Sequence, residues 1–238
     1  MTGRLIGVGV GPGDPGLLTL KAARVIEAAP VIAYPAPDDG PSFARSIVAD
    51  LLGRQREIEI VVPMRVERFP AQDVYDDAAV RIASALDGGD DVAVLCEGDP
   101  FFYGSFMYLF SRLADRYPSE IVPGVSSLTA GAGALGLPLA ERNEVLRVVP
   151  GPSTDEVIVE SLEAPGPIVF IKVGRHFARL RTLIDATGRG GDARYVERAT
   201  LPNERRSTLN DAGTTAPYFS MVFVPGRQQQ GGRINAPK

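Results

Sequence analysis

Two carboxylates in the middle of the chain stand two residues apart, next to aromatic side chains. Glu97 and Asp99 flank Gly98, and Pro100 and the aromatic run 101–103 follow directly. Carboxylates can remove a proton or hold a cation, whereas an isolated pair in a loop is often only solvated. A rigid aromatic segment is costly to leave in water without a partner. We interpret this stretch as one wall of a small-molecule site.

Basic residues gather at a second place, around the only histidine of the chain. His176 follows Arg175, and Arg179 lies four residues after Arg175 on the same helical face. Cations at the start of a helix oppose its dipole, so an anionic ligand would explain this placement, although a solvated basic face is the plain alternative. A later predicted strand ends in three more polar residues, Glu197, Arg198 and Thr200.

A glycine-rich loop occupies residues 7–16. A dinucleotide-binding loop would need glycine where Pro12 and Asp14 stand, and the Gly-Lys-Ser/Thr ending of a phosphate-binding loop is absent. Pro12 also lacks the backbone N–H that would help to bind an anion. The loop is therefore either a plain strand-to-helix turn or a rigid wall beside a ligand that is not a pyrophosphate.

All these residues lie at the ends of predicted buried strands. Residues 92–96 form a short apolar run that stops at Glu97, and Phe106, Leu109 and Leu113 mark an amphipathic helix after it. Strands are predicted at 4–8, 31–34, 58–62, 92–96, 120–122, 145–149, 168–173, 193–196 and 218–224, with helices between them. The first helix is expected to begin at Asp14 and Pro15, and residues 35–41 are expected to form a loop. In open α/β sheets, ligands bind beyond the carboxyl ends of the strands.

The pattern predicts an α/β fold with two domains, each a mostly parallel or mixed sheet flanked by helices. At 238 residues, the chain exceeds the usual size of one α/β core. We place the boundary between Tyr117 and Pro118, which gives an N-terminal domain at 1–117 and a C-terminal domain at 118–225. The polar tail 226–238 is expected to be disordered. A helix containing Gly131–Ala134 has almost no side chains there, so something must pack close to it.

Composition limits the class of function. The formal net charge of −4 and the pI near 5.2 argue against a broad basic face for nucleic acid. No apolar run approaches the roughly 18 residues of a membrane helix, and no signal-peptide pattern opens the chain, so we expect a soluble cytoplasmic protein. The single cysteine, Cys96, is expected to be a buried small hydrophobe. One histidine and one cysteine are too few for a metal site, and a serine-hydrolase arrangement is excluded.

Four ordered motifs carry a family resemblance. They are Gly9–Thr19, Cys96–Ser105, Pro123–Ser127 and Arg198–Pro202, within a match that covers roughly residues 3 to 225. In order and spacing they resemble the motifs of the tetrapyrrole methyltransferase family. Further strings at 42–50, 101–108, 174–178, 195–198 and 217–221 are most similar to the branch that methylates precorrin-2 at C20, giving precorrin-3A, in cobalamin biosynthesis. The resemblance implies two α/β domains with S-adenosylmethionine (SAM) between them, and a homodimer.

The resemblance also implies which residues contact SAM. In the first half these are Pro12, Glu97, Gly98, Asp99, Phe102 and Tyr103, followed by the turn residues Ser126 and Ser127. In the second half they are Lys172, Val173, Thr200 and Leu201. Many family members have two glycines where Glu97 and Gly98 stand, which leaves the role of the Glu97 side chain open.

The chemistry that the resemblance implies asks mainly for positioning. SAM is an activated methyl donor with a positive sulfonium, and the meso carbon of the reduced macrocycle is nucleophilic. A proton must leave that carbon, and the candidates for its removal are Glu97, Asp99, Tyr103 and His176, besides solvent or a substrate carboxylate. The carboxylates of precorrin-2 would be held by Arg175, Arg179 and Arg198.

Several alternatives stay open at this point. The same fold could methylate cobalt-precorrin-2, uroporphyrinogen III, a later corrin, a diphthamide precursor or ribosomal RNA, although the acidic balance disfavours RNA. No set of metal ligands in the sequence distinguishes a metal-free substrate from one that carries cobalt. A function of a different class is a non-catalytic tetrapyrrole or nucleotide binder that keeps the fold without turnover.

Overall fold

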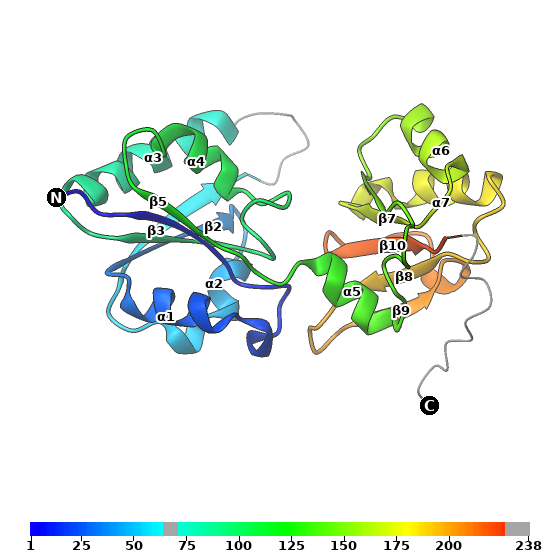
Figure 1. The fold of residues 1–238 in the computed structure, drawn as a ribbon, viewed down its shortest axis with the longest axis horizontal. Coiled ribbons are helices and arrows are strands. Elements are labelled where there is room, and N and C mark those ends of the chain that lie inside the picture. The colour runs from blue at the N-terminus through cyan, green and yellow to red at the C-terminus, as the bar shows by residue number, and fades with distance from the viewer. Residues whose placement is uncertain (64–70, 227–238) are drawn as a thin grey trace. The chain divides into compact units, whose positions relative to one another are not determined.

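The computed structural model describes residues 1–63 and 71–226, in two compact units (Figure 1). The first unit is Met1–Ser126 and the second is Ser127–Lys238. Each contains one five-stranded sheet with helices packed against it, which confirms the predicted α/β fold class. Apart from Gly226, the tail that we expected to be disordered lies outside the described residues.

The first sheet is parallel throughout, in the order β3-β2-β4-β1-β5. Its strands are β1 (Leu5–Gly9), β2 (Val31–Pro37), β3 (Arg56–Val62), β4 (Val92–Cys96) and β5 (Ser119–Val122). Every residue of β1 and β4 is buried, as expected of strands covered on both faces. Because the strands are parallel, all their carboxyl ends meet at one edge of the sheet.

Helices cover both faces of this sheet (Figure 1). On one face, α3 (Ala71–Asp87) and α4 (Phe106–Leu113) share a core with alternate strand residues such as Val92 and Val94. On the other, α1 (Leu20–Ala28) and α2 (Phe43–Ile47) pack on the intervening residues, such as Ala93 and Leu95. Two 3₁₀ turns, η1 (Pro15–Leu17) and η2 (Ala49–Leu51), complete this layer.

The second sheet is mixed, in the order β6-β7-β10-β8-β9. Its strands are β6 (Arg147–Pro150), β7 (Ile168–Ile171), β8 (Arg194–Glu197), β9 (Arg205–Thr208) and β10 (Ser220–Val224). Strand β10 runs antiparallel to β7 and β8, and β6 runs parallel to β7. The carboxyl ends of β6, β7 and β8 therefore share one edge with the start of β10.

One face of the second sheet packs on α5 (Ser127–Leu135), and the other packs on α6 (Asp155–Glu163) and α7 (Phe177–Ala186) (Figure 1). The 3₁₀ turn η3 (Gly174–His176) leads from β7 into α7, and η4 (Asn210–Ala212) follows β9. Within the described residues, no helix is both long enough and apolar enough to cross a membrane.

The units divide after Ser126, and not after Tyr117 as predicted. The reason is that β5 adds to the first sheet beside β1, with Leu5 opposite Ser119 and Val8 opposite Val122. Tyr117 and Pro118 lie between α4 and β5, so they mark a change of element within the first unit. Residues 119–126 thus belong to the first unit.

Three local expectations were also wrong. Asp14 caps only η1, accepting from the Gly16 N–H at 2.7 Å, and α1 begins at Leu20 behind its N-cap Thr19. Residues 35–37, expected in a loop, belong to strand β2, which pairs with β3 as far as Pro37 but with β4 only as far as Ala33. The prolines therefore have a neighbouring strand on one side only, where a missing N–H is tolerated. Strand β9 was missed because it is a polar edge strand without alternating apolar residues.

Candidate functional site

Three loops meet at the carboxyl edge of the first sheet. They follow β1, β4 and β5 and contain Pro12, the segment 97–105, and residues 123–126. An antiparallel bridge joins the first two loops: Gly11 N–H donates to Gly98 O at 3.3 Å, and Gly98 N–H donates to Gly11 O at 2.8 Å. The structure therefore fixes the two loops that the sequence singled out against each other.

Backbone approaches backbone at this edge so closely that side chains have no room. A Cβ on Gly124 would lie 2.0 Å from Gly98 O, and one on Gly9 would lie 2.6 Å from Gly124 Cα. Gly98 also has a left-handed backbone, with φ of 66°. We call Gly9, Gly98 and Gly124 the glycine cradle. Gly9 and Gly124 were not among the predicted site residues: each comes just after a predicted strand, 4–8 or 120–122, but these two strands were assigned to different domains.

Asp99 ties two of the loops together. Its Oδ1 accepts from the Phe101 N–H at 2.9 Å, and its Oδ2 accepts from the Gly124 N–H at 3.1 Å. Because both carboxylate oxygens already accept backbone hydrogen bonds, Asp99 suits the role of a support for the cradle better than that of a general base.

Glu97 occupies a different environment. Burial raises the pKa of its carboxyl group, while backbone hydrogen bonds at Glu97 itself and at Ala44, in the first turn of α2, oppose that shift. The net direction is upward. A carboxyl group with a raised pKa is able to exchange a proton nearer to neutral pH, so among the predicted candidates Glu97 keeps this chemistry.

The aromatic segment after Asp99 lies at the surface. Phe102 and Tyr103 are exposed and pack edge to face, with ring centroids 5.1 Å apart. Tyr103 has φ of 57°, a conformation that is rare for a residue with a side chain. Pro12, in the facing loop, is half-buried. These residues leave apolar surface at this edge of the sheet, a property that small-molecule sites share.

The predicted residues of the second unit lie at the shared edge of its sheet. Lys172 directly follows β7, is exposed, and has φ of 53°. Val173 is 0% exposed and packs in the core with Phe177, so its side chain cannot face a ligand. Thr200 has φ of 73°, and its N–H donates to the Glu204 carboxylate at 2.7 Å, while the Leu201 N–H donates to Arg198 O at 2.9 Å.

The three predicted arginines differ in their partners. Arg179 forms an ion pair with Asp155 and donates to the carbonyl oxygens of Gly151 and Ser153, so it fastens the loop after β6. Arg175 is exposed, and its Nε donates to His176 Nε2 at 3.3 Å. The structure therefore leaves Arg175 better placed than Arg179 to meet an anionic ligand.

The surroundings of His176 favour its neutral form. Burial lowers the pKa of the imidazole, and the positive charges of Arg175 and Arg179 lower it further. A neutral imidazole can accept a proton, so His176 also keeps its place as a candidate for proton removal.

Arg198 forms an ion pair with Glu197 at 2.8 Å. The place of Glu197 at a strand end had led us to expect that its carboxylate faces a ligand. Glu197 is only 8% exposed, so it does not.

Ser126 and Ser127 lie where the two units join. Ser126 is the last residue of the first unit, and Ser127 opens α5 and is exposed. Within residues 1–63 and 71–226, no group of three or more His, Cys, Asp or Glu side chains is arranged to hold a metal ion.

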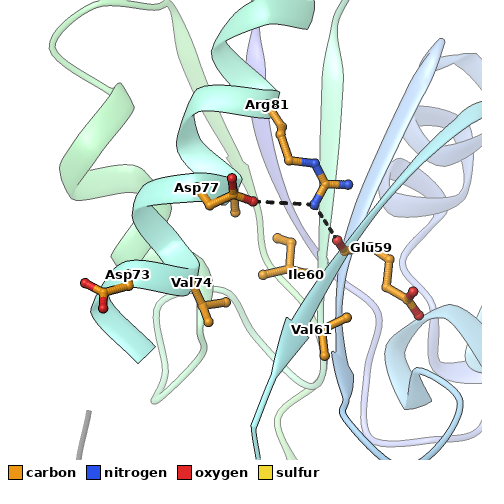
Figure 2. Close-up of a pocket in the computed structure, with 8 residues that line it drawn as sticks. Glu59, Ile60, Val61, Asp73, Val74, Asp77 and Arg81 are labelled. Atoms are coloured by element: carbon orange, nitrogen blue, oxygen red, sulfur yellow. Dashed lines mark hydrogen bonds and ion pairs between the residues drawn. The ribbon is translucent and has the colours of Figure 1, made fainter. Parts of the chain in front are cut away.

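A hollow of about 330 Å³ lies between β3 and α3, as Figure 2 shows. It is lined by Glu59, Ile60, Val61, Asp73, Val74, Asp77, Ala78 and Arg81. Arg81 closes one side, where it lies 3.9 Å from Asp77 and donates to Glu59 O at 2.9 Å. None of the predicted site residues lines this hollow.

Comparison with known proteins connects this geometry to one family. The model of the Tetrapyrrole (Corrin/Porphyrin) Methylases matches residues 4–213. The chain is 42% identical over 238 residues to the cobalamin biosynthesis protein CobIJ of Mycobacterium tuberculosis, an alignment that covers 96% of this chain and 47% of that protein. The chain thus spans about half the length of this relative.

Two further comparisons cover whole proteins. The chain is 40% identical over 234 residues to precorrin-2 C(20)-methyltransferase of a Sinorhizobium species, which covers 94% of this chain and 96% of that protein. Uroporphyrin-III C-methyl transferase of Thermus thermophilus, solved in complex with S-adenosyl homocysteine, superposes with a TM-score of 0.70 at 24% identity, covering 96% of this chain and 99% of that chain. At that identity the likeness establishes the common fold.

Proposed function

Because the chain belongs to the tetrapyrrole (corrin/porphyrin) methylase family, we propose that it methylates precorrin-2 at the C20 meso carbon, with SAM as the methyl donor, in cobalamin biosynthesis. The observation that carries this proposal is the 40% identity to a precorrin-2 C(20)-methyltransferase over 94% of this chain and 96% of that enzyme. The product would be precorrin-3A.

The residues at the edge of the first sheet fit SAM. Gly9 and Gly124 have no room for a Cβ, so the backbones of the three loops pack directly on one another and would offer main-chain groups to a ligand at this edge. The carboxylate of Glu97 suits a positively charged sulfonium, and Phe102 and Tyr103 offer apolar surface to an adenosine. Pro12 provides no N–H for a phosphate, in keeping with a cofactor that has none.

The proposed cofactor residues are Pro12, Glu97, Gly98, Asp99, Phe102, Tyr103, Ser126, Ser127, Lys172, Val173, Thr200 and Leu201. Val173 would act only through its backbone, since its side chain is buried in the core. When bound, SAM supplies an activated methyl group. Asp99 would keep the loops of the cradle in register, through its bonds to Phe101 and Gly124.

The substrate has many carboxylates, and the exposed guanidinium of Arg175, with Arg198, would bind them. Either Glu97 or His176 would take the proton that the meso carbon loses. Burial raises the pKa of Glu97 toward neutral pH, and it lowers the pKa of His176, which favours the neutral imidazole that can accept a proton. Glu97→Gln and His176→Gln distinguish the two candidates, because only replacement of the true base should lower kcat with little change in KM.

We also propose that the protein works as a homodimer in the cytoplasm. The support for the compartment is the single, buried Cys96, which can form no internal disulfide. Sedimentation equilibrium of the full chain would give a mass twice the 25.3 kDa of one chain if the dimer forms, and 25.3 kDa if it does not.

The experiment that tests the function compares substrates. Purified protein is incubated anaerobically with SAM and with precorrin-2, cobalt-precorrin-2 or uroporphyrinogen III, and product mass is followed with time. We expect one added methyl group, with the highest kcat/KM for precorrin-2. Preference for cobalt-precorrin-2 would reassign the substrate within the same reaction, whereas preference for uroporphyrinogen III, or no transfer at all, would contradict the proposal.

A further inference from the structure

The guanidinium of Arg198 is held by a buried carboxylate. Arg198 Nη1 donates to Glu197 Oε1 at 2.8 Å, and the other carboxylate oxygen, Oε2, accepts from the Tyr195 hydroxyl at 2.5 Å. Tyr195 is fully buried, whereas 36% of the Arg198 side chain is exposed. One end of this chain of hydrogen bonds is therefore anchored in the core, and the other reaches the surface.

The backbone of Arg198 is fixed as well. Its φ of 51° lies in the left-handed region, and its N–H donates to Phe219 O, directly before β10, at 2.7 Å. A non-glycine residue keeps such a conformation only when its surroundings enforce it. The side chain and the main chain of Arg198 are thus both held before any ligand arrives.

Burial and the neighbouring carboxylate of Glu197 raise the pKa of the Tyr195 hydroxyl, so it stays protonated and continues to donate to Glu197. Phe177 packs against the ring of Tyr195, with ring centroids 5.2 Å apart, and Ser220 also lies within hydrogen-bonding reach of the Tyr195 hydroxyl. The carboxylate of Glu197 is therefore oriented by the core.

The edge around Arg198 matches a flat molecule with carboxylates on its rim. Tyr218 and Phe219, which are 59% and 42% exposed, lead into the neighbouring strand β10, and Lys172 and Arg175 follow β7, on the far side of β10. An arginine side chain without fixed partners would lose rotamer entropy on binding a carboxylate. If its side chain is already ordered in the unbound protein, part of that entropic cost is removed.

We propose that Glu197, oriented by Tyr195, is a positioning residue that holds Arg198 ready to bind a carboxylate of the tetrapyrrole. This inference rests on the proposed function for the identity of the ligand. Glu197 would touch no substrate, because it is buried, and its effect would pass entirely through Arg198. If Glu197 had a purely structural role, its replacement would change folding stability without changing how strongly Arg198 binds a carboxylate.

Glu197→Asp tests this idea without changing charge. The shorter side chain keeps its negative charge but cannot reach both Tyr195 and Arg198. Binding of uroporphyrin III, a stable polycarboxylate tetrapyrrole, is measured by fluorescence titration for the wild type, Glu197→Asp, Arg198→Ala and the double variant. We expect Glu197→Asp to weaken binding about fivefold in the wild-type background, and to have no effect once Arg198 is alanine.

Equal weakening by Glu197→Asp in both backgrounds, or unchanged affinity in the wild-type background, would overturn the proposal. Asp185→Asn, at an exposed carboxylate 3.9 Å from Arg181, is the matched control and should leave affinity unchanged. If Glu197→Asp does not fold, Tyr195→Phe keeps the ion pair, removes only the orienting hydroxyl, and is judged by the same double-variant comparison. Because no turnover is involved, failure of the proposed methyl transfer would show separately, in the wild type.

Discussion

At the scale of single residues, Asp99 and Glu97 show what a sequence motif leaves undecided. The family resemblance implied that both contact the cofactor, and both were candidates for the base. In the structure, Asp99 accepts backbone hydrogen bonds on both oxygens, whereas Glu97 is half-buried and its carboxyl group has a raised pKa. The difference could not be predicted, because the partner of Asp99, Gly124, is distant in sequence and arrives only through the pairing of β5 with β1.

If Asp99 supports the glycine cradle, Asp99→Ala should weaken SAM binding about tenfold in calorimetry, because the loops after β4 and β5 lose their shared acceptor. Asp91→Ala is the matched control. Asp91 also accepts a backbone N–H, from Arg4 at 2.7 Å, but it precedes β4 and so lies at the opposite end of that strand. An equal loss of affinity in both variants would show that the effect comes from general destabilisation.

Glu97→Gln should make stability less dependent on pH. The folded protein holds the proton of Glu97 above the ordinary pKa of 4.5, so the unfolded chain releases it first as pH rises. The free energy of unfolding of the wild type should therefore fall relative to that of Glu97→Gln as pH rises from about 4.5 through the higher folded pKa, and then level off. Urea unfolding from pH 4 to 8 measures this. A difference that stays constant, or that grows in favour of the wild type as pH rises, would contradict the raised pKa of Glu97.

At the scale of elements, the apolar strands were predictable and the polar ones were not. The run 92–96 became β4 with the same bounds, and Phe106, Leu109 and Leu113 are the buried face of α4. Strand β9 offers only polar residues, and β2 runs on into prolines because one of its neighbours stops pairing. The boundary between the units was mispredicted for a similar reason. Strand β5 is short, and its own residues do not indicate that it pairs with β1 in the first sheet.

Helix α5 contains two glycines with opposite expected responses to substitution. A Cβ on Gly131 would lie 2.9 Å from the ring of Phe223, whereas a Cβ on Gly133 would meet nothing within 4 Å. Gly131→Ala should therefore lower the free energy of unfolding by about 1–2 kcal/mol through overpacking. Gly133→Ala should raise it by about 0.5–1 kcal/mol, because glycine is a poor helix former.

Chemical denaturation of the two variants checks this pair of predictions, and each variant serves as the control for the other. Stabilisation by both would mean that α5 does not pack on β10 as described. The sequence did predict a close contact for this helix, but only the fold identifies Met221 and Phe223 as its partners and confines the contact to Gly131.

At the scale of the whole molecule, the proposed binding of SAM predicts linkage between ligand and stability. A ligand that binds only the folded protein stabilises it by about 2.7 kcal/mol at a concentration 100 times its Kd. SAM should therefore raise Tm in a concentration-dependent way, and NADH should not, because the glycine loop lacks dinucleotide spacing. Gly124→Ala, whose Cβ would lie 2.0 Å from Gly98 O, should abolish the shift with SAM. A shift with NADH alone would contradict the assignment of the cradle.

The measurement that tests the central claim most directly is the fate of a labelled methyl group. The full chain is incubated anaerobically with precorrin-2 and SAM carrying ¹³C in its methyl group, and the product is analysed by ¹³C NMR. We predict a single enriched methyl carbon attached to the C20 meso position, and no transfer by Gly124→Ala. Enrichment at any other carbon, or recovery of unmethylated precorrin-2 although SAM binds, would contradict the claim that this chain is a C20 methyltransferase.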